Sequence, residues 1–313
     1  MTLNELKYIV AVAREHHFGQ AAKACFVSQP TLSVAVKKLE EELGVSIFER
    51  GQGDVSVTAI GEQIVAQAQR VLEEADGVKQ LALQGKNQLT GPLRLGAIYT
   101  IGPYLFPSLI PLLAETAPEM PLIIEENYTS VLTEKLKQGE LDAIIISKPF
   151  TEPGILTLDL YQEPFVILLP SAHPLTRYKT IKKQQLLEEN ILLLGAGHCF
   201  RDQVLKFCPE CLPSGKTTSG VMSGNLEGSS LETIRYMVAS GLGLTLLPCT
   251  AAGADRFSER LIAIRRFERE QPARFVSIAW RKSFPRPEVI TALKSAILGC
   301  KLSCVSPISV TNT

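Results

Sequence analysis

Apolar residues recur at helical spacing at the start of the chain. They predict an amphipathic helix over residues 6–13, a short second helix over 18–25, and a third helix that begins after Ser28. Ser28 is a good N-cap, and Pro30 lies in the first turn, where its missing N–H costs little. The apolar positions of the third helix step by four, three and four residues and predict one buried stripe, made of Leu32, Val36, Leu39 and Leu43.

Two short β-rich runs follow the third helix. Residues 47–50 and 55–58 flank Gly51-Gln52-Gly53-Asp54, whose composition is typical of the turn of a β-hairpin. The three helices and the hairpin together predict a compact N-terminal unit over residues 1–58, in which the hairpin forms a wing.

A long helical pattern runs from Thr58 to about Lys86. Its apolar positions alternate spacings of four and three residues: Ile64, Ala68, Val71, Ala75, Val78 and Ala82. A sustained period of 3.5 residues is typical of a helix that pairs with a second copy of itself, so we expect a dimerising linker. The alternative is a helix that packs on its own domain. The polar segment from Gly85 to Pro92 is the expected hinge.

Beyond the hinge, apolar β-rich runs alternate with helical patterns. Strands are predicted over residues 93–98, 122–125, 143–146, 165–170, 191–194 and 244–247, and helices through 105–113, 132–136 and 230–240. This alternation predicts an α/β domain with a parallel sheet. The tail after Cys300 is polar, and we expect it to be frayed.

Composition and charge limit the choice of partners. A chain of 313 residues with 45% hydrophobic content predicts two or three folded domains. No apolar run approaches the ~20 residues that a membrane helix needs, and Glu5 and Lys7 interrupt the apolar start that a signal peptide requires. The protein is therefore expected in the cytoplasm. A formal net charge of zero gives no sign of a nucleic-acid partner, so a role in DNA binding depends on local geometry.

The third predicted helix presents a face suited to reading DNA. Gln29 and Ser33 can form hydrogen bonds with base edges, and Val34 and the Pro30 ring can contact a thymine methyl group, while Lys37 can reach a phosphate. Helical hairpins in enzymes share this geometry, so the pattern on its own leaves that alternative open.

The seven cysteines offer a different chemistry. In a reducing compartment they are better interpreted as free, reactive or metal-binding thiols than as a disulfide framework. Cys199 follows a glycine-rich turn at a predicted helix N-terminus, with His198 before it and Arg201 after it. The helix dipole and the cation both favour thiolate, the form that peroxide oxidises to sulfenic acid. The alternative is an inert buried cysteine.

Cys208 lies nine residues after Cys199. If the segment is helical, the two Cα atoms are ~13 Å apart, whereas a disulfide requires them within ~7 Å. A bond between them would therefore require the segment to unwind, which would couple oxidation to a change of conformation. In Cys208-Pro-Glu-Cys211 the second thiol could compete with the first, or both could bind zinc with Cys199.

The N-terminal motifs resemble those of LysR-type transcriptional regulators. The matching stretches are Phe18-Gly-Gln-Ala-Ala22, Ser28-Gln-Pro-Thr-Leu-Ser33, Lys38-Leu-Glu40, Leu43-Gly44, Phe48-Glu-Arg50 and Thr58 with Gly61-Glu62. The resemblance implies an α/β protein with an N-terminal winged helix-turn-helix (1–58), a linker helix and hinge (59–87), and an effector domain (88–313). The effector domain would contain two α/β subdomains like those of periplasmic binding proteins, about 88–161 with 268–302, and about 162–267.

The same resemblance implies the partners. They are double-stranded promoter DNA, RNA polymerase and further copies of the chain, as a homodimer or homotetramer. The short apolar runs argue against a membrane partner, and we expect no cofactor. The residues expected at DNA are Ser28, Gln29, Pro30, Thr31, Ser33, Val34, Lys37 and Arg50.

Further motifs resemble the peroxide-sensing branch of that family. They are Gly197-His-Cys199, Arg201-Asp-Gln203, Cys208, Ala97-Ile-Tyr-Thr-Ile-Gly-Pro-Tyr104 and Ser229-Ser-Leu-Glu-Thr233. By matching position, Cys199 would react with hydrogen peroxide and Cys208 would resolve the product as a disulfide, and oxidative-stress genes would be activated. The peroxide pocket would be shaped by Thr100, Thr129, His198, Arg201, Asp202 and Arg274. The sequence departs from the pattern in Cys211 and in a long Gly- and Ser-rich loop over 213–228.

Two other functions stay open at the level of sequence. The first is a LysR-type regulator that binds a small organic ligand between its subdomains. The second is a thiol peroxidase that uses Cys199 and Cys208, which the N-terminal DNA-reading unit disfavours. The sequence contains no Ser/His/Asp arrangement, phosphate loop or paired-carboxylate motif, and we expect no enzyme activity.

Overall fold

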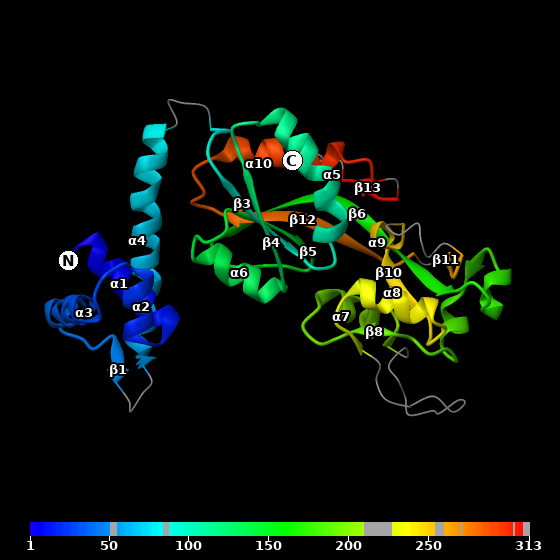
Figure 1. The fold of residues 1–313 in the computed structure, drawn as a ribbon, viewed down its shortest axis with the longest axis horizontal. Helices are drawn as coiled ribbons and strands as arrows, with labels where there is room; N and C mark the ends of the chain where they lie inside the picture. Colours follow the sequence, from blue (N-terminus) through cyan, green and yellow to red (C-terminus); the bar gives the residue numbers. More distant parts are fainter. Residues whose placement is uncertain are drawn as a thin grey trace. The chain divides into compact units, whose positions relative to one another are not determined.

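The chain forms two compact units, Met1–Asn87 and Gln88–Thr313, and each is described by itself. The computed structural model describes residues 1–50, 55–83, 88–209, 227–253, 260–269, 271–302 and 304–308. In these ranges no helix is long and apolar enough to cross a membrane. Figure 1 shows the fold of both units.

The first unit packs its helices around one apolar core. Its elements are α1 (Leu3–Glu15), α2 (Phe18–Ala24), α3 (Gln29–Leu43), β1 (Phe48–Arg50), β2 (Val55–Val57) and α4 (Ala59–Leu83). Strands β1 and β2 pair antiparallel, as the predicted wing requires, and the turn residues 51–54 lie outside the described residues. The Ser28 hydroxyl accepts a hydrogen bond from the backbone N–H of Thr31 at 3.3 Å, which confirms Ser28 as the N-cap of α3.

The predicted stripe on α3 is correct at three of its four positions. Leu32, Val36 and Leu39 are fully buried, but Leu43 is 40% exposed. Helix α3 ends at Leu43, and Gly44 follows in the left-handed conformation with its N–H bonded to the Glu40 carbonyl. The last residue of the stripe therefore lies where the chain turns away from the core, so its side chain is not covered.

The first half of helix α4 packs against the core of its own unit. Ala68 is buried in the core that includes α1, and Ile64 and Val71 pack against that core. Further along, Val78 is 67% exposed. The alternative of packing on its own domain is thus correct for the first half of the helix, while the second half keeps an exposed apolar residue.

The second unit combines a mixed sheet with flanking helices. Its elements are β3 (Leu93–Ile98), α5 (Gly102–Thr116), β4 (Leu122–Asn127), α6 (Thr129–Lys137), β5 (Ala143–Ser147), β6 (Ile155–Pro170), β7 (Thr180–Ile181), β8 (Leu193–Leu194), α7 (Cys199–Phe207), β9 (Glu227–Gly228), α8 (Leu231–Ala239), β10 (Thr245–Pro248), α9 (Cys249–Ala252), β11 (Ile262–Phe267), β12 (Ala273–Arg281), α10 (Pro287–Gly299) and β13 (Ser306–Pro307). Short 3₁₀ helices occupy Pro174–Arg177 and Lys183–Leu186.

The sheet is only partly parallel, so the prediction of a parallel sheet is wrong for its second half. Strand β3 pairs parallel with β4 and β5, but the long strand β6 runs antiparallel to β10, β11 and β12. In Figure 1, α5 and α10 cover one face of the first half of the sheet and α6 covers the other. One buried core contains residues of β3, β5, α5 and α10, and a second contains residues of β6, β8, β10 and α8. These are the two α/β subdomains expected from the fold class.

The C-terminal tail is ordered as far as the structure describes it, so the prediction of fraying is wrong there. Strand β13 pairs antiparallel with β6. Cys304, just before β13, forms a disulfide with Cys249, the first residue of α9. The expectation of free or metal-binding thiols is therefore also wrong for these two cysteines.

Candidate functional site

Cys199 is the first residue of helix α7, as the sequence predicts. His198 occupies the N-cap position with extended backbone angles, and Gly197 precedes it with φ = +94°. A Cβ atom on Gly197 would lie 3.4 Å from ring atoms of Tyr128. The positive φ of this turn therefore requires glycine. The turn places the Cys199 thiol at the N-terminal end of α7.

The thiol faces a small pocket of about 180 Å³, counted with its opening to solvent. The pocket is lined by Ile98, Tyr99, Thr100, Asn127, Tyr128, Thr129, Gly197, His198 and Cys199. Four predicted residues thus meet there: Thr100, Thr129, His198 and Cys199. Arg201, Asp202 and Arg274, which were also expected there, are not among the lining residues. Sequence reasoning missed Tyr99, Asn127 and Tyr128, although both tyrosines immediately precede a predicted threonine.

Aromatic rings form one wall of the pocket. The ring centroids of Tyr128 and His198 are 4.8 Å apart, and those of Tyr99 and Tyr128 are 5.3 Å apart. His198 Nε2 lies 3.2 Å from the carbonyl oxygen of Ser229, which fixes the ring orientation. Burial lowers the pKa of His198 despite this contact, so the imidazole is neutral at pH 7 and supplies no positive charge to the thiol.

The acidity of Cys199 differs from the sequence-based prediction. Burial raises the pKa of the thiol above its ordinary value, and the charge of Asp202 adds to the rise. The Arg274 guanidinium and the Thr129 hydroxyl oppose it. Arg201, the cation expected from the sequence, instead donates to the carbonyl oxygen of Leu194. The charge that favours thiolate therefore comes from Arg274, which is 75 residues away in sequence.

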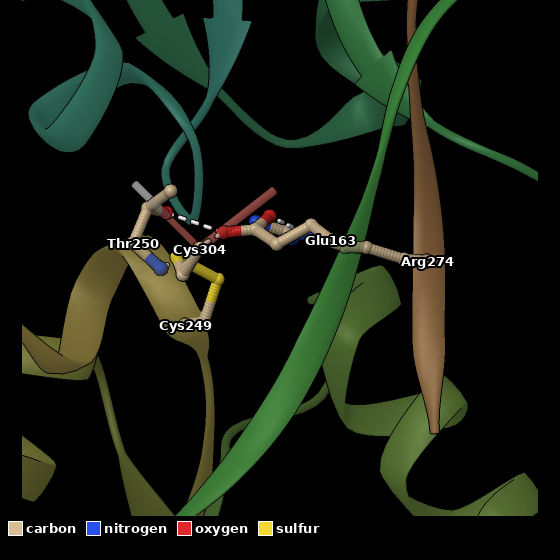
Figure 2. Close-up of a disulfide and its surroundings, with 5 residues drawn as sticks. All are labelled: Glu163, Cys249, Thr250, Arg274 and Cys304. Atoms are coloured by element: carbon tan, nitrogen blue, oxygen red, sulfur yellow. Dashed lines mark hydrogen bonds and ion pairs between the residues drawn. A yellow bond between two sulfur atoms is a disulfide. The ribbon is translucent and has the colours of Figure 1, made fainter. Parts of the chain in front are cut away.

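Arg274 is held in place from three sides. Its Nε donates to Glu163 Oε2 at 2.7 Å, and both side chains are fully buried. Its Nη1 and Nη2 donate to the hydroxyl and carbonyl oxygens of Thr100, each at 2.8 Å. Its guanidinium carbon lies 5.5 Å from the ring centroid of Phe200, the neighbour of Cys199. Figure 2 shows the Glu163–Arg274 pair crossing between strands β6 and β12. Arg274 thus joins the pocket to the centre of the sheet.

The Thr129 hydroxyl is a buried group that faces the reaction site. It lowers the pKa of the Cys199 thiol, and in the described part of the chain its oxygen meets no hydrogen-bond partner other than that thiol. The Thr100 oxygen already accepts from Arg274, so its own proton remains to be donated. The pocket therefore offers hydroxyl groups to a small polar molecule beside a thiol.

Cys208 follows the last residue of α7 and is fully buried in the second core. Because residues 199–207 are helical, the Cα atoms of Cys199 and Cys208 are ~13 Å apart. Cys199 is a free thiol and Cys208 is in a disulfide, so the two are not joined to each other. Cys211 lies outside the described residues. Within those residues no cluster of three His, Cys, Asp or Glu side chains is placed to hold a metal ion.

The predicted DNA-reading face of α3 is open to solvent. Its side chains at Ser28, Gln29, Pro30, Thr31, Val34 and Lys37 are exposed, and Ser33 is half-buried. The side chain of Arg50 lies outside the described part of the structure. The exposed face combines amide, hydroxyl, apolar and cationic groups on one helix, which is the chemistry that base edges and phosphates require.

Two family profiles cover most of the chain. Residues 3–62 match the profile described as "Bacterial regulatory helix-turn-helix protein, lysR family", and residues 86–299 match "LysR substrate binding domain". The chain belongs to the LysR family. The helix-turn-helix match covers α1, α2, α3 and the wing, and the second match covers both subdomains and the pocket.

Curated LysR relatives with high similarity are peroxide regulators by name. The chain is 36% identical to "DNA-binding transcriptional dual regulator OxyR" of Escherichia coli K12, over 95% of each chain. It is also 36% identical to the "Probable hydrogen peroxide-inducible genes activator" of Streptomyces viridosporus, over 95% of this chain and 94% of that protein.

Solved LysR structures agree with these relatives. A full-length OxyR variant from Pseudomonas aeruginosa is 55% identical, with a TM-score of 0.80 and 96% of each chain covered. An OxyR cysteine-to-serine variant from Corynebacterium glutamicum, described as bound to H2O2, is 31% identical with a TM-score of 0.61, over 96% of this chain and 94% of that one.

Proposed function

We propose that this LysR-family chain senses hydrogen peroxide through Cys199 and converts its oxidation into altered promoter binding that activates oxidative-stress genes. The observation that carries the proposal is the pocket itself, where a free Cys199 thiol faces the hydroxyl groups of Thr100 and Thr129 under the charge of Arg274. The names of the OxyR relatives point to the same signal.

The first step would be oxidation of the thiol. Cys199 loses its proton, and the thiolate attacks one oxygen of hydrogen peroxide. The O–O bond breaks, and the other oxygen leaves as hydroxide, which takes up the proton and becomes water. Hydroxyl protons of Thr100 and Thr129 stabilise the charge on the leaving oxygen. Sulfur is oxidised to sulfenic acid while peroxide is reduced.

The second step would convert oxidation into a change of shape. A Cys208 thiolate attacks the sulfenic acid, a disulfide forms and the hydroxyl group leaves as water. Because α7 separates the two cysteines by ~13 Å, the helix must unwind before they can bond. Cys208 is already in a disulfide, so a cellular dithiol must first reduce it to the thiol.

The output would be exerted on promoter DNA through α3, with residues 1–58 as the DNA-binding domain, 59–87 as the linker and 88–313 as the sensor. We infer a homodimer or homotetramer that forms through α4 and sensor domains, and contact with RNA polymerase at activated promoters. The exposed Val78 supports pairing of the linker helix.

The deciding experiment for sensing is the Cys199→Ser variant of the full chain. The proteins are first reduced with dithiothreitol and freed of it, so that Cys208 is a thiol. Promoter binding and transcription with RNA polymerase are then measured before and after peroxide, and we expect the variant not to respond. Cys25→Ser, which removes another free thiol in the first unit, should respond as wild type does. A full response by Cys199→Ser would contradict the proposal and favour a regulator that binds a small organic ligand.

DNA reading is tested separately with Lys37→Ala. Lys37 is exposed on the predicted reading face, and Glu41 lies 3.6 Å from its ammonium group in an exposed ion pair of little strength. We expect weaker binding to all DNA sequences and a salt dependence reduced by about one counterion. Lys23→Ala, an exposed substitution on α2, should leave both quantities unchanged. Equal salt slopes for Lys37→Ala and wild type would remove Lys37 from the interface.

A further inference from the structure

The disulfide between Cys249 and Cys304 lies next to a buried polar chain that reaches the peroxide pocket. Cys249 is buried at the start of α9, and Cys304 is half-buried in the tail before β13. Figure 2 shows Thr250, the neighbour of Cys249, facing Glu163 beside the disulfide. No other bond in the described chain joins the C-terminal tail covalently to the second core.

The polar chain begins at Thr250. Its backbone N–H donates to Glu163 Oε1 at 3.1 Å, and its hydroxyl donates to the same oxygen. The other oxygen of Glu163 accepts from Arg274 Nε. One carboxylate thus holds both partners at once. Because Glu163 and Arg274 are fully buried, water cannot replace either contact without a large cost.

The polar chain ends at the pocket. Arg274 donates to the hydroxyl and carbonyl oxygens of Thr100, which lines the pocket. Any displacement of Thr250 leaves a buried carboxylate oxygen short of its donors, and the ion pair must adjust. The adjustment would move the guanidinium relative to Thr100 and Cys199.

Helix α9 depends on outside support to keep Thr250 in place. It spans Cys249–Ala252, a single turn that is too short to be stable in isolation. Its anchors are the bond to Cys304, the contacts with Glu163 and the burial of Ala251 and Ala252. Cys304 is in turn fixed by the pairing of β13 with β6, the strand that carries Glu163. The disulfide therefore closes a small ring around the contact between Thr250 and Glu163.

We propose that Cys249 and Cys304 form a second redox site, whose state is transmitted to the peroxide pocket through Thr250, Glu163 and Arg274. The inference rests on the proposed function of Cys199. With the bond intact, Arg274 is held against Thr100 and Cys199 reacts at full rate. With the bond reduced, α9 is released, Arg274 is held less firmly and Cys199 reacts more slowly.

Reduction of the disulfide requires a dithiol, and its re-formation requires hydrogen peroxide. Reduction transfers two electrons from a dithiol. One thiolate of the dithiol attacks the half-buried Cys304 sulfur, and the Cys249 sulfur leaves as thiolate and takes up a proton. The second thiol of the dithiol then displaces Cys304 from the mixed disulfide. The products are two protein thiols and the oxidised reductant. Reoxidation by hydrogen peroxide converts the two thiols into the disulfide and yields two molecules of water.

The site itself is tested by mass spectrometry of the full chain after differential alkylation. We expect the Cys249–Cys304 bond in protein whose Cys199 is free, its loss after dithiothreitol under native conditions, and its return after peroxide. Failure of the bond to form under any of these conditions, or resistance to excess dithiothreitol in the folded protein, would overturn the assignment.

Transmission to the pocket is tested by kinetics of Cys199. In the Cys249→Ser/Cys304→Ser variant we expect oxidation by peroxide to slow roughly threefold to tenfold, as a modest coupling between sites predicts. The pH profile of Cys199 alkylation should move to higher pH, because the charge of Arg274 favours thiolate. Cys300→Ser is the matched control: it removes a free, buried cysteine at the C-terminal end of α10 and should leave both measurements unchanged.

A second pair of variants keeps the disulfide and interrupts the polar chain at Thr250, the residue that follows Cys249. Thr250→Val lacks the hydroxyl and should slow Cys199, while Thr250→Ser retains the hydroxyl and should restore the wild-type rate. This pair decides the question if the double cysteine variant does not fold. Wild-type rates in both the double variant and Thr250→Val would overturn the proposal. If wild-type Cys199 itself fails to react with peroxide, the proposed function fails instead, while the mass spectrometry still judges Cys249 and Cys304.

Discussion

The acidity of the Cys199 thiol depends on which of two opposing effects is larger. Burial disfavours the thiolate, whereas Arg274 and Thr129 favour it, and burial prevails because the pKa is raised. The resting thiol is therefore largely protonated at neutral pH. Its reactivity toward peroxide must then come from groups that stabilise the transition state, in particular the hydroxyls that face the leaving oxygen.

This balance predicts the pH dependence of the reaction. Since the folded-state pKa of Cys199 lies above the ordinary value of about 8.5, alkylation should keep accelerating as the pH rises beyond that value. Thr129→Val removes a group that lowers the pKa, so its profile should move further up and its rate at pH 7.5 should fall by roughly threefold to tenfold, as the loss of one hydrogen bond implies.

Thr133→Val is the control for that variant. Thr133 lies one turn later on α6, and its hydroxyl donates to the Thr129 carbonyl rather than into the pocket. Its profile should match wild type, as measured by iodoacetamide alkylation of Cys199 between pH 6 and 10. A Thr129→Val profile that overlies wild type would show that this hydroxyl does not act on the thiol.

The residues around Cys199 also show which parts of the site could be predicted from the sequence and which could not. Cys199 at a helix N-terminus, and the meeting of Thr100, Thr129 and His198 beside it, follow from motifs and are found in the structure. Neighbours in sequence point to Arg201 as the nearby cation, and only the resemblance to the peroxide-sensing branch places Arg274 at the pocket. Arg274 reaches the site because β12 pairs with β6, a contact between distant segments that spacing along the chain does not reveal.

At the scale of elements, α7 connects the two cores. The Cys199 end packs against the first core, and the Cys208 end is buried in the second. Midway along the helix, the Gln203 side chain donates to the Ser147 hydroxyl at 2.8 Å and to the Lys148 carbonyl at 3.0 Å. These bonds fasten α7 to the end of β5. They exist only while α7 is helical at this position, so they stabilise the reduced state against unwinding.

Gln203→Ala should therefore ease the step from sulfenic acid to disulfide. Two hydrogen bonds contribute about 1–3 kcal/mol, so we expect the disulfide to form roughly fivefold to a hundredfold faster in the variant, while the initial oxidation of Cys199 keeps its rate. Quenched-flow alkylation separates the two steps. Gln184→Ala, at an exposed position of a 3₁₀ helix, is the control. A disulfide step that is unchanged or slower in Gln203→Ala would show that these bonds do not restrain α7.

The elements that sequence predicted wrongly share a physical cause. Periodicity reports which positions are buried, and it located β3, β5, α8 and most of α3 correctly. It does not report strand direction, which is why the antiparallel pairing of β6 was missed. The tail was expected to fray because it is polar, but pairing with β6 and the bond from Cys304 to Cys249 supply stabilisation that composition does not show.

At the scale of the whole molecule, α4 presents a surface that one copy of the chain does not cover. Its first half packs into the core of the first unit, but Val78 is 67% exposed. We expect Val78→Glu to shift the chain toward monomer in sedimentation and to weaken promoter binding, because a buried charge would oppose pairing of two α4 helices. Gln63→Glu adds the same charge at an exposed position nearer the start of α4 and should have neither effect. An unchanged oligomer in Val78→Glu would place the dimer contact elsewhere.

The state of Cys208 decides whether oxidation at the pocket can spread through the second unit. While Cys208 is in its own disulfide, it has no thiol with which to attack the Cys199 sulfenic acid. Protein used without reduction should therefore stop at sulfenic acid after one equivalent of peroxide, and promoter binding should not change. Protein first treated with dithiothreitol, and freed of it, should go on to the Cys199–Cys208 bond.

Hydrogen exchange provides the structural readout of that difference. Only the reduced protein should lose amide protection across α7 after peroxide, because bonding of Cys199 to Cys208 requires the helix to unwind. Loss of protection should extend to β5, where Gln203 is attached. If both preparations respond alike, two explanations remain, and peptide mapping separates them. A Cys199–Cys208 bond in both preparations would show that the Cys208 disulfide exchanges faster than sulfenic acid forms. Absence of that bond in both would show that the switch does not use Cys208.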